Sequence, residues 1–200
     1  MNKTKSTFAL LLGGALVLSL NTHASEVVFN VRDLGAKGDG QTLDTAAIQK
    51  AFDSVKKGGG TIIFPAGNYV SAPLVLKGDK ITVRLEEGAT LTASTNQSLF
   101  LKAGSGDWLK ATSGGDFNPF LSIKDGTDVT ITGKGTIEGN GSVWWEAAEE
   151  ARRKVSGFTL PRPNLIVPTR ITNLRITGIT IQNSPKFHLV PTECENVWIE

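Results

Sequence analysis

LIVPTRITNLRITGITIQN (residues 165–183) and HLVPTECENVWIE (residues 188–200) are two copies of one repeat, and they decide the fold. The copies align without a gap, with Asn173 on Asn196 at a step of 23 residues. Each copy has a short β-branched run, a polar turn with an asparagine, and a second β-branched run. The longer copy adds a glycine and a third run.

Looser copies precede these two. FLSIKDGTDVTITGKGTIEG (residues 120–139) carries Asp128 at the asparagine position, and GDKITVRLEEGATLTAS begins at Gly78. Repeats of this length without a helical period are typical of solenoids. Three short runs per repeat, separated by Gly, Asn and Pro, predict coils of parallel strands stacked about 4.8 Å apart.

One coil cannot bury its own apolar side chains, so stacked coils would share a continuous core. The alternative is an antiparallel sandwich whose strands resemble one another by chance. The shared register and turn chemistry of the two copies favour the solenoid.

Residues 1–24 have the pattern of a signal peptide. Lys3 and Lys5 precede an uncharged apolar run, Phe8 to Leu20, and Thr22-His23-Ala24 follows it. This predicts cleavage after Ala24 and export to the periplasm or the medium. A membrane anchor is the weaker alternative, because the run is short for a bilayer. Residues 25–200 would then form one domain.

Removal of the signal changes the charge balance. The whole chain has 21 Lys and Arg against 19 Asp and Glu, and residues 1–24 hold two lysines and no acid. The exported chain is therefore neutral, and the sequence predicts no nucleic-acid partner. Seven basic residues and no acid lie between positions 152 and 192: Arg152, Arg153, Lys154, Arg162, Arg170, Arg175 and Lys186. They predict a polyanionic ligand if they share a face. The alternative is a balanced surface whose acids come from other coils.

Cys194 is the only cysteine. It excludes an intrachain disulfide, and no zinc or iron–sulfur spacing is present. We expect this thiol to be buried and inert.

A short amphipathic helix is predicted from Thr45 to Lys57, after a strand at residues 27–31. Its apolar residues recur at i, i+3, i+4 and i+7: Ile48, Ala51, Phe52 and Val55. Asp44 or Thr45 is expected to accept a hydrogen bond from the free N–H groups at its start, and Gly58 to end it in a left-handed conformation. Such a helix would cap the open end of the first coil.

Two insertions interrupt the repeats. The first, at residues 102–118, contains Trp108, which would either pack the loop onto the wall or offer a face to a sugar ring. The second, GSVWWEAAEEARRK at residues 141–154, is rich in helix formers. We interpret Trp144 and Trp145 as anchors of this helix rather than as ligand-binding residues.

Several stretches of the sequence resemble those of a known family. DLGAKGDGQTLDTAAIQKAFD (residues 33–53) and GGGTIIFPAGNYV (58–70) resemble the N-terminal signature of secreted pectin-degrading β-helix enzymes and phage tailspikes. GTIEGNGSVWWEA (135–147), RPNLI (162–166) and ITIQNSPKFHLVP (179–191) are similar to glycoside hydrolase family 28, the polygalacturonases and their relatives. The resemblance covers the chain from Val27 to Glu200, with one departure at Phe187, where the family often has Trp.

The resemblance implies an all-β fold, a right-handed parallel β-helix of the pectin-lyase type. It also implies inverting hydrolysis of α-1,4 linkages between galacturonic acid residues, with an acidic polysaccharide as partner. No organic cofactor and no metal would be needed, and the full-length enzyme would be a monomer. Inversion requires a carboxylic acid and a carboxylate roughly 6.5–9.5 Å apart, so that water fits between them.

The family takes these carboxyl groups from an Asn-Thr-Asp motif and an Asp-Asp pair, supported by His-Gly and Arg-x-Lys motifs. Asn-Thr-Asp, Asp-Asp and His-Gly do not occur in residues 1–200, and in the family all four motifs follow the segment at which this chain ends. We therefore assign no catalytic residue and no substrate-binding residue. The chain is predicted to be an N-terminal portion, truncated at Glu200 and inactive alone.

The acids that are present do not replace these motifs. Asp125 and Asp128 are expected to bond their own backbone in a turn of the repeat, and Glu193 and Glu195 flank the next turn. Glutamates 146, 149 and 150 would form a solvated helix face. His188 has two conflicting predictions: strand alternation from an inward Phe187 places it in a cleft, whereas alignment with Leu121 points it inward.

Two other functions stay open. One is a non-catalytic β-helix that binds polyuronate through the basic stretch of residues 152–192. The other is a different pectin-active enzyme on the same scaffold, either a rhamnogalacturonan hydrolase or a lyase, which fold-level similarity does not exclude. A lyase would call for a metal-binding carboxylate cluster, which the sequence does not show. The exact polysaccharide and endo or exo action are likewise open.

Overall fold

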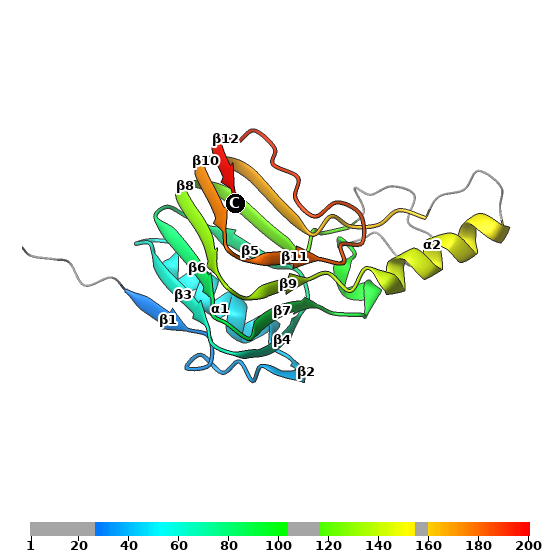
Figure 1. The fold of residues 1–200 in the computed structure, drawn as a ribbon, viewed down its shortest axis with the longest axis horizontal. Helices are drawn as coiled ribbons and strands as arrows, with labels where there is room; N and C mark the ends of the chain where they lie inside the picture. Colours follow the sequence, from blue (N-terminus) through cyan, green and yellow to red (C-terminus); the bar gives the residue numbers. More distant parts are fainter. Residues whose placement is uncertain (1–26, 104–116, 155–159) are drawn as a thin grey trace, which may run out of the picture.

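The chain forms a parallel β-helix, in which the backbone winds through three walls per coil (Figure 1). The computed structural model describes residues 27–103, 117–154 and 160–200. All pairings between its named strands are parallel, as the repeats predict.

The first wall consists of β1 (Val28–Asn30), β3 (Gly60–Phe64), β6 (Ile81–Leu85), the second halves of β8 (Leu121–Gly133) and β10 (Ile166–Thr177), and β12 (Glu195–Ile199). The second wall consists of β2 (Asp39–Leu43), β4 (Gly67–Ser71), β7 (Ala89–Ala93), β9 (Thr136–Glu138) and β11 (Thr180–Gln182). The third consists of β5 (Leu74–Lys77) and the first halves of β8 and β10. The helical elements are α1 (Thr45–Val55), the 3-10 turn η1 (Gln97–Phe100) and α2 (Ser142–Lys154).

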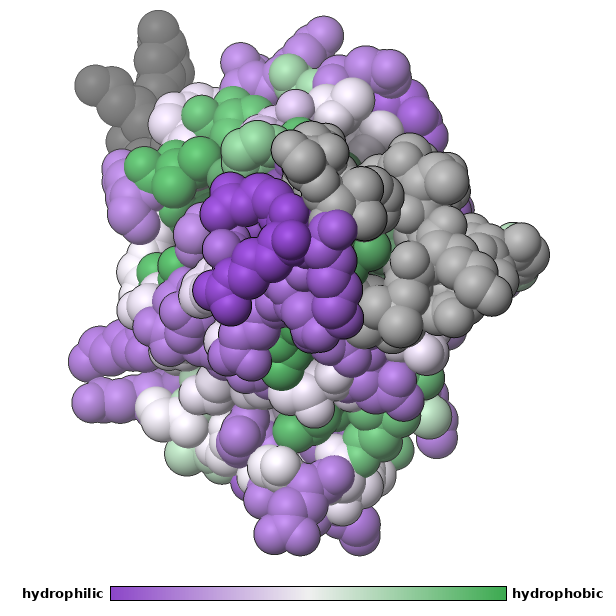
Figure 2. Space-filling view, turned by 90° about the vertical axis from the view of Figure 1, so that its right-hand side faces the viewer, coloured by the Kyte–Doolittle hydropathy of each residue, from purple (hydrophilic) through white to green (hydrophobic). Residues whose placement is uncertain are grey.

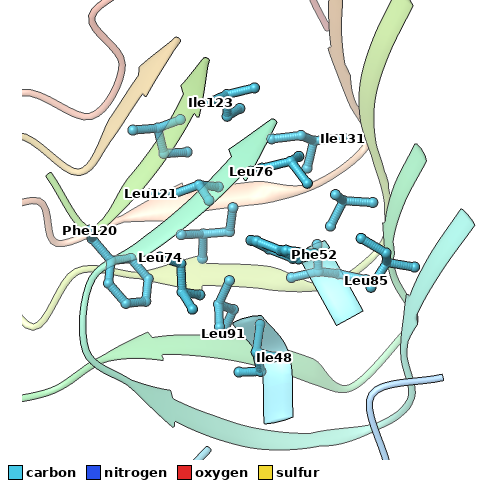
Figure 3. Close-up of a cluster of buried hydrophobic side chains, with 14 of the residues drawn as sticks. Ile48, Phe52, Leu74, Leu76, Leu85, Leu91, Phe120, Leu121, Ile123 and Ile131 are labelled. Carbon is cyan, nitrogen blue, oxygen red and sulfur yellow. The ribbon is translucent and has the colours of Figure 1, made fainter. Parts of the chain in front are cut away.

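Identical positions of successive coils stack into columns that form the core. One column on the first wall is set by strand register and contains Phe29, Ile62, Val83, Ile131, Ile176 and Ile199. Its middle members are buried, with 0% of Ile131 and 2% of Ile176 exposed. Figure 3 shows Ile131 pointing into the same interior as Leu76 and Leu121 of the third wall. The interior is therefore one shared core, because no coil encloses its own side chains.

The corner between the third and first walls explains the asparagine of the repeat. Asp128, Asn173 and Asn196 all have positive φ there, between 54° and 60°. Asn173 Nδ2 donates to Asp128 Oδ1 at 2.7 Å, and Asn196 Nδ2 donates to Asn173 Oδ1 at 3.0 Å. The side chains thus form a ladder between coils, and asparagine tolerates the left-handed backbone better than most residues.

A second ladder, of charged residues, stands beside the first. Asp125, Arg170 and Glu193 have φ of 55°, 54° and 52°. Arg170 Nε donates to Asp125 Oδ1 at 2.7 Å, and a further Arg170 nitrogen lies 3.9 Å from Glu193 Oε2. Asp125 and Asp128 were expected to bond their own backbone. The hydrogen bonds observed go to residues of the next coil instead, so that expectation is wrong.

The predicted N-terminal helix is present as α1, and its apolar face is buried as expected. Figure 3 shows Ile48 and Phe52 turned toward Leu74, Leu85 and Leu91. In coil order α1 takes the place of a third-wall strand below β5. The Gln49 side chain completes the cap: its Nε2 donates to the Val75 carbonyl at 2.8 Å, and its Oε1 accepts from the Val75 N–H at 3.0 Å.

The chemistry of both helix ends differs from the prediction. Asp44 stands at the N-cap without a capping bond, because its carboxylate accepts from the N–H groups of Lys37 and Gly38 at 2.7 and 2.9 Å. Thr45 Oγ1 accepts instead from the Ala72 N–H. The helix ends at Val55, and the left-handed residue is Gly59 rather than Gly58. Tertiary contacts have taken the groups that local capping would use.

Both insertions leave the coil at the corner between the second and third walls. The second one forms α2, as predicted, and α2 projects from the body of the molecule (Figure 1). Trp144 is fully buried and makes edge-to-face contacts with Phe100 of η1 and with Phe117 of the first insertion. The anchoring role of Trp144 is therefore confirmed. Trp108 lies outside the described residues.

Several other expectations concern the ends of the chain. Residues 1–24, the predicted signal peptide, lie outside the described residues. No helix in the described parts is both long and apolar enough to cross a membrane. Cys194 is only partly buried, and its thiol donates to the Thr192 carbonyl oxygen, so the expectation of a buried thiol is wrong.

Candidate functional site: a polar groove across the second wall

An open groove of about 830 Å³ crosses the outer face of the second wall. Its floor comes from β2, β4, β7 and β9, which follow one another up the molecule in Figure 1. Residues 94–99 between β7 and the first insertion, Asn140, Asn183 and the start of α2 contribute the rest of its described lining. The groove therefore runs across the strands, along the axis of the β-helix.

Strand register explains the polar floor. One outward row contains Asn68, Thr90, Thr136 and Thr180, and the next contains Val70, Thr92, Glu138 and Gln182. The residues between these rows, Tyr69, Leu91 and Ile137, are buried in the core. Side chains alternate between faces along a strand, so the core receives apolar residues, and the groove-facing rows are polar except at Val70.

Glu138 is held in place by three hydrogen bonds. Its Oε1 accepts from the Asn140 N–H at 2.7 Å, and its Oε2 accepts from the side-chain amides of Gln182 and Asn183, both at 2.8 Å. Two of these donors belong to the next coil. The carboxylate is thereby fixed in one orientation at the groove surface.

Other polar groups of the groove are also positioned in advance. Thr92 donates from its hydroxyl to Asn68 Oδ1 at 2.5 Å, and this leaves Asn68 Nδ2 oriented as a donor. Asn140 Nδ2 donates to the Ala93 carbonyl at 2.6 Å. A surface of fixed hydroxyl and amide groups can bind the hydroxyl groups of a sugar with little loss of side-chain entropy.

Trp145 provides the aromatic part of the groove. Its indole N–H lies 3.1 and 3.2 Å from the carbonyl oxygens of Ser184 and Pro185, and 42% of the residue is exposed. These bonds fix the ring while leaving part of it in solvent. The predicted anchoring role is confirmed for Trp145 as well, but the ring also lines the groove.

The groove lining includes no basic residue among those that the structure describes. Glu138 is the one ionisable side chain in that lining. The described residues that line it are Gly40, Gln41, Leu43, Asn68, Val70, Thr90, Thr92, Ser94, Thr95, Asn96, Leu99, Glu138, Asn140, Ser142, Trp145 and Asn183. A single carboxylate does not make the acid pair that glycoside hydrolysis uses.

The basic stretch of residues 152–192 does not form one binding face. Three of its residues lie on α2, where glutamates of the same helix pair with them. Arg170 lies at a corner of β10 and pairs with Asp125 of the coil below, and Arg175 stacks 5.3 Å above the Trp198 ring. The alternative of a balanced surface fits these pairs. Figure 2 shows the α2 end as a compact hydrophilic patch.

The other residues singled out from the sequence lie outside the described lining of the groove. His188 is exposed, and Leu189 is the residue that pairs with Ile166, so the inward prediction for His188 is wrong. Phe187 is 57% exposed, which also contradicts the inward orientation assumed for it. Glu149 and Glu150 form exposed pairs on α2, as a solvated face requires. Within ranges 27–103, 117–154 and 160–200, no cluster of His, Cys, Asp or Glu could hold a metal ion.

Sequence reasoning did not single out Glu138. It lies in the three-residue strand β9, too short to show alternation, and the residues that hold it come from the following coil. The available signal was its place two residues before Asn140 in the quoted GTIEGNG stretch.

Known proteins resemble this chain in sequence and in fold. A polygalacturonase of Persea americana is 31% identical over 170 residues, which are 84% of this chain and 34% of that protein. An endo-polygalacturonase of Pectobacterium carotovorum is 31% identical over 165 residues, 77% of this chain and 40% of that protein. The chain thus spans between a third and two-fifths of these relatives.

A solved family 28 exopolygalacturonase of Yersinia enterocolitica superposes with a TM-score of 0.68 at 26% identity, over 87% of this chain and 38% of that one. The fold is accordingly a right-handed parallel β-helix, as expected. A second family model, rhamnogalacturonase A/epimerase, pectate lyase-like, matches residues 28–83.

Strand order and superposition together place the chain in the class of parallel β-helix proteins. More narrowly, the chain belongs to glycosyl hydrolases family 28, whose model matches residues 56–200.

Proposed function

We propose that this chain is the N-terminal part of an exported hydrolase that cleaves the α-1,4 linkages of galacturonan by inversion. The observation that carries the proposal is the family 28 match over residues 56–200, which includes the strands and α2 around the groove. The catalytic acids would follow Glu200, because the groove described here has one carboxylate where inversion needs two.

In this proposal the groove holds part of the polysaccharide beside the chemistry rather than performing it. Its direction along the helix axis would lead the substrate toward coils that stack beyond β12. The protein would act as a monomer and need no organic cofactor, and residues 1–24 would direct its export.

The activity of the 200-residue chain tests the first part of the proposal. Purified chain incubated with polygalacturonate should release no galacturonate above a blank preparation, as measured by reducing-end assay. Release above the blank would show that the catalytic acids lie within residues 1–200 and would overturn the assignment downstream.

The mass of the native exported protein tests the second part. An antibody against residues 25–200 should detect a species much larger than 21.3 kDa, and that species should hydrolyse polygalacturonate. A stable exported species of the size of residues 25–200 alone would contradict the hydrolase proposal and favour a non-catalytic binding protein.

A further inference from the structure

We infer that the groove binds an uncharged stretch of galacturonan, in which the uronate carboxyl groups are esterified, in preference to the free polyanion. The inference rests on the proposed binding of a pectin-type chain and states which chemical form of it this part of the protein accepts.

Charge provides the first argument. Each unesterified uronate is ionised at neutral pH, and a carboxylate that loses water needs a cation or several donors in exchange. The described lining contains Glu138 and no Lys, Arg or His. The two side-chain amides nearest this acid are already bonded to it. On this described part of the lining, a polyanion would therefore meet a like charge and no compensating cation.

The hydrogen-bonding groups provide the second argument. The floor consists largely of neutral hydroxyl and amide groups, among them Thr90 and the Asn68 amide, whose Nδ2 remains a donor. Such groups suit sugar hydroxyls and ester carbonyl oxygens. The partly exposed ring of Trp145 adds an apolar surface for the C–H side of a sugar ring or for an ester methyl group.

The surface next to the groove extends the same charge pattern. A shallow depression on the other side of Trp145 is lined by Glu146, Glu149, Glu150 and Arg153 of α2. Arg153 there already pairs with Glu149. A chain that passes Trp145 therefore leaves a groove with one carboxylate and meets a surface with more acids than bases.

The first test compares two probes on the full 200-residue chain. Galacturonate hexamer and its fully methyl-esterified form would be titrated by calorimetry at neutral pH and about 0.01 M salt, where charges act over about 30 Å. We expect the ester to bind at least about tenfold more tightly, a difference of about 1.4 kcal/mol. Tighter binding of the free acid, or no binding of either probe, would overturn the inference.

A charge-introducing variant tests the cause of the preference. Thr90→Lys puts a cation on the groove floor, at a position that faces outward in β7. It should raise the affinity for the free acid about tenfold, in a salt-sensitive manner, and leave the ester affinity within about twofold. The matched control is Thr82→Lys, on β6 of the first wall, which should change neither affinity. Equal effects of both variants would contradict a local origin.

A second variant locates the bound sugar. Trp145→Ala should weaken ester binding about tenfold, whereas Trp145→Phe should retain most of it, because a ring remains. Circular dichroism of both variants would confirm that the strands are intact. Unchanged ester binding by a folded Trp145→Ala protein would place the sugar outside the groove and reject the inference.

The two proposals fail separately. Loss of the ester preference in these titrations leaves the hydrolase proposal intact, because the native exported protein can still cleave polygalacturonate. Absence of cleavage by that native protein rejects the hydrolase proposal but does not change which probe the groove binds.

Discussion

Left-handed residues at the corners show how single positions set the shape of the coil. Six non-glycine residues with positive φ form the two ladders, one polar and one charged. A left-handed conformation costs an ordinary L-residue roughly 1–2 kcal/mol, so the side chain must compensate. The asparagine ladder does so with hydrogen bonds between coils, whereas the charged ladder relies on exposed ion pairs, which contribute little.

Asn173 is the residue where this balance can be measured. Asn173→Ala should lower the free energy of unfolding by about 2–3 kcal/mol, from the lost bonds to Asp128 and Asn196 and from backbone strain. Asn173→Gly removes the same bonds but tolerates φ of 60°, so it should cost less than alanine. Urea unfolding of the three proteins provides the measurement, and equal losses for Ala and Gly would exclude the strain contribution.

Asp39 predicts a pH dependence. Hydrogen bonds from the backbone N–H of Thr42, then from that of Gln41, then from the Thr42 hydroxyl lower the pKa of Asp39 from 3.8 to about 2. A lowered folded-state pKa means that the ionised form stabilises the fold above pH 3.8, and that this stabilisation is lost as the pH falls toward about 2.

Asp39→Asn should therefore shift the urea midpoint downward at neutral pH, and the difference from the natural chain should disappear between pH 3.8 and about 2. A difference that persists at the acid end would show that the bonds do not depend on ionisation of Asp39.

Among the elements, α1 shows which features could be predicted from the sequence and which could not. Its span and buried face followed from an apolar period of 3.6, because that signal is local. Its caps did not, because Asp44 and Thr45 bond to a loop and to β4–β5 residues that no local pattern reveals. The same distinction holds for α2, whose helical sequence was clear but whose partners came from another insertion.

Gln49 joins α1 to the edge of the sheet, so its removal should destabilise the protein and expose β5 to exchange with solvent. Gln49→Ala should cost about 1 kcal/mol, because water can replace its two bonds only in part. The more specific expectation is faster hydrogen exchange at the Val75 amide, measured by NMR. Gln49→Glu is the matched control: it keeps an acceptor for that N–H but loses the donor to the carbonyl. Unchanged exchange in the alanine variant would contradict the capping role.

At the scale of the whole molecule, the cost of a core substitution should depend on its place in the stack. Ile131 and Ile199 occupy the same column, but Ile131 is fully buried and 59% of Ile199 is exposed. Ile131→Ala should lower the free energy of unfolding by about 2–5 kcal/mol. Ile199→Ala should lower it by less than about 1 kcal/mol.

Denaturant unfolding of both variants provides the comparison in one background. Similar losses at the two positions would mean that the last coil is packed as tightly as the middle ones, against the exposure described above.

The coil architecture could be predicted from the sequence, because the length of a repeat gives the register between neighbouring strands. The step from Asn173 to Asn196 predicted the pairing of Leu174 with Val197. The groove did not follow. Its described lining comes from successive coils, from residues 94–99 and from the second insertion, and residues as distant as Gln41 and Asn183 line one groove only once the coils are stacked. Glu138 shows the difficulty most clearly, since two of its three donors lie about 45 residues downstream.

The shared exit point of the two insertions has a consequence for how such a molecule can change over time. Both leave the coil after a second-wall strand and return at a third-wall strand, beside the groove, while the strands keep their register. Loops at that corner can therefore vary without changing the pairing of the strands. Related proteins could carry longer, shorter or different loops there. The border of the groove would then differ between them, while the stack of coils stayed the same.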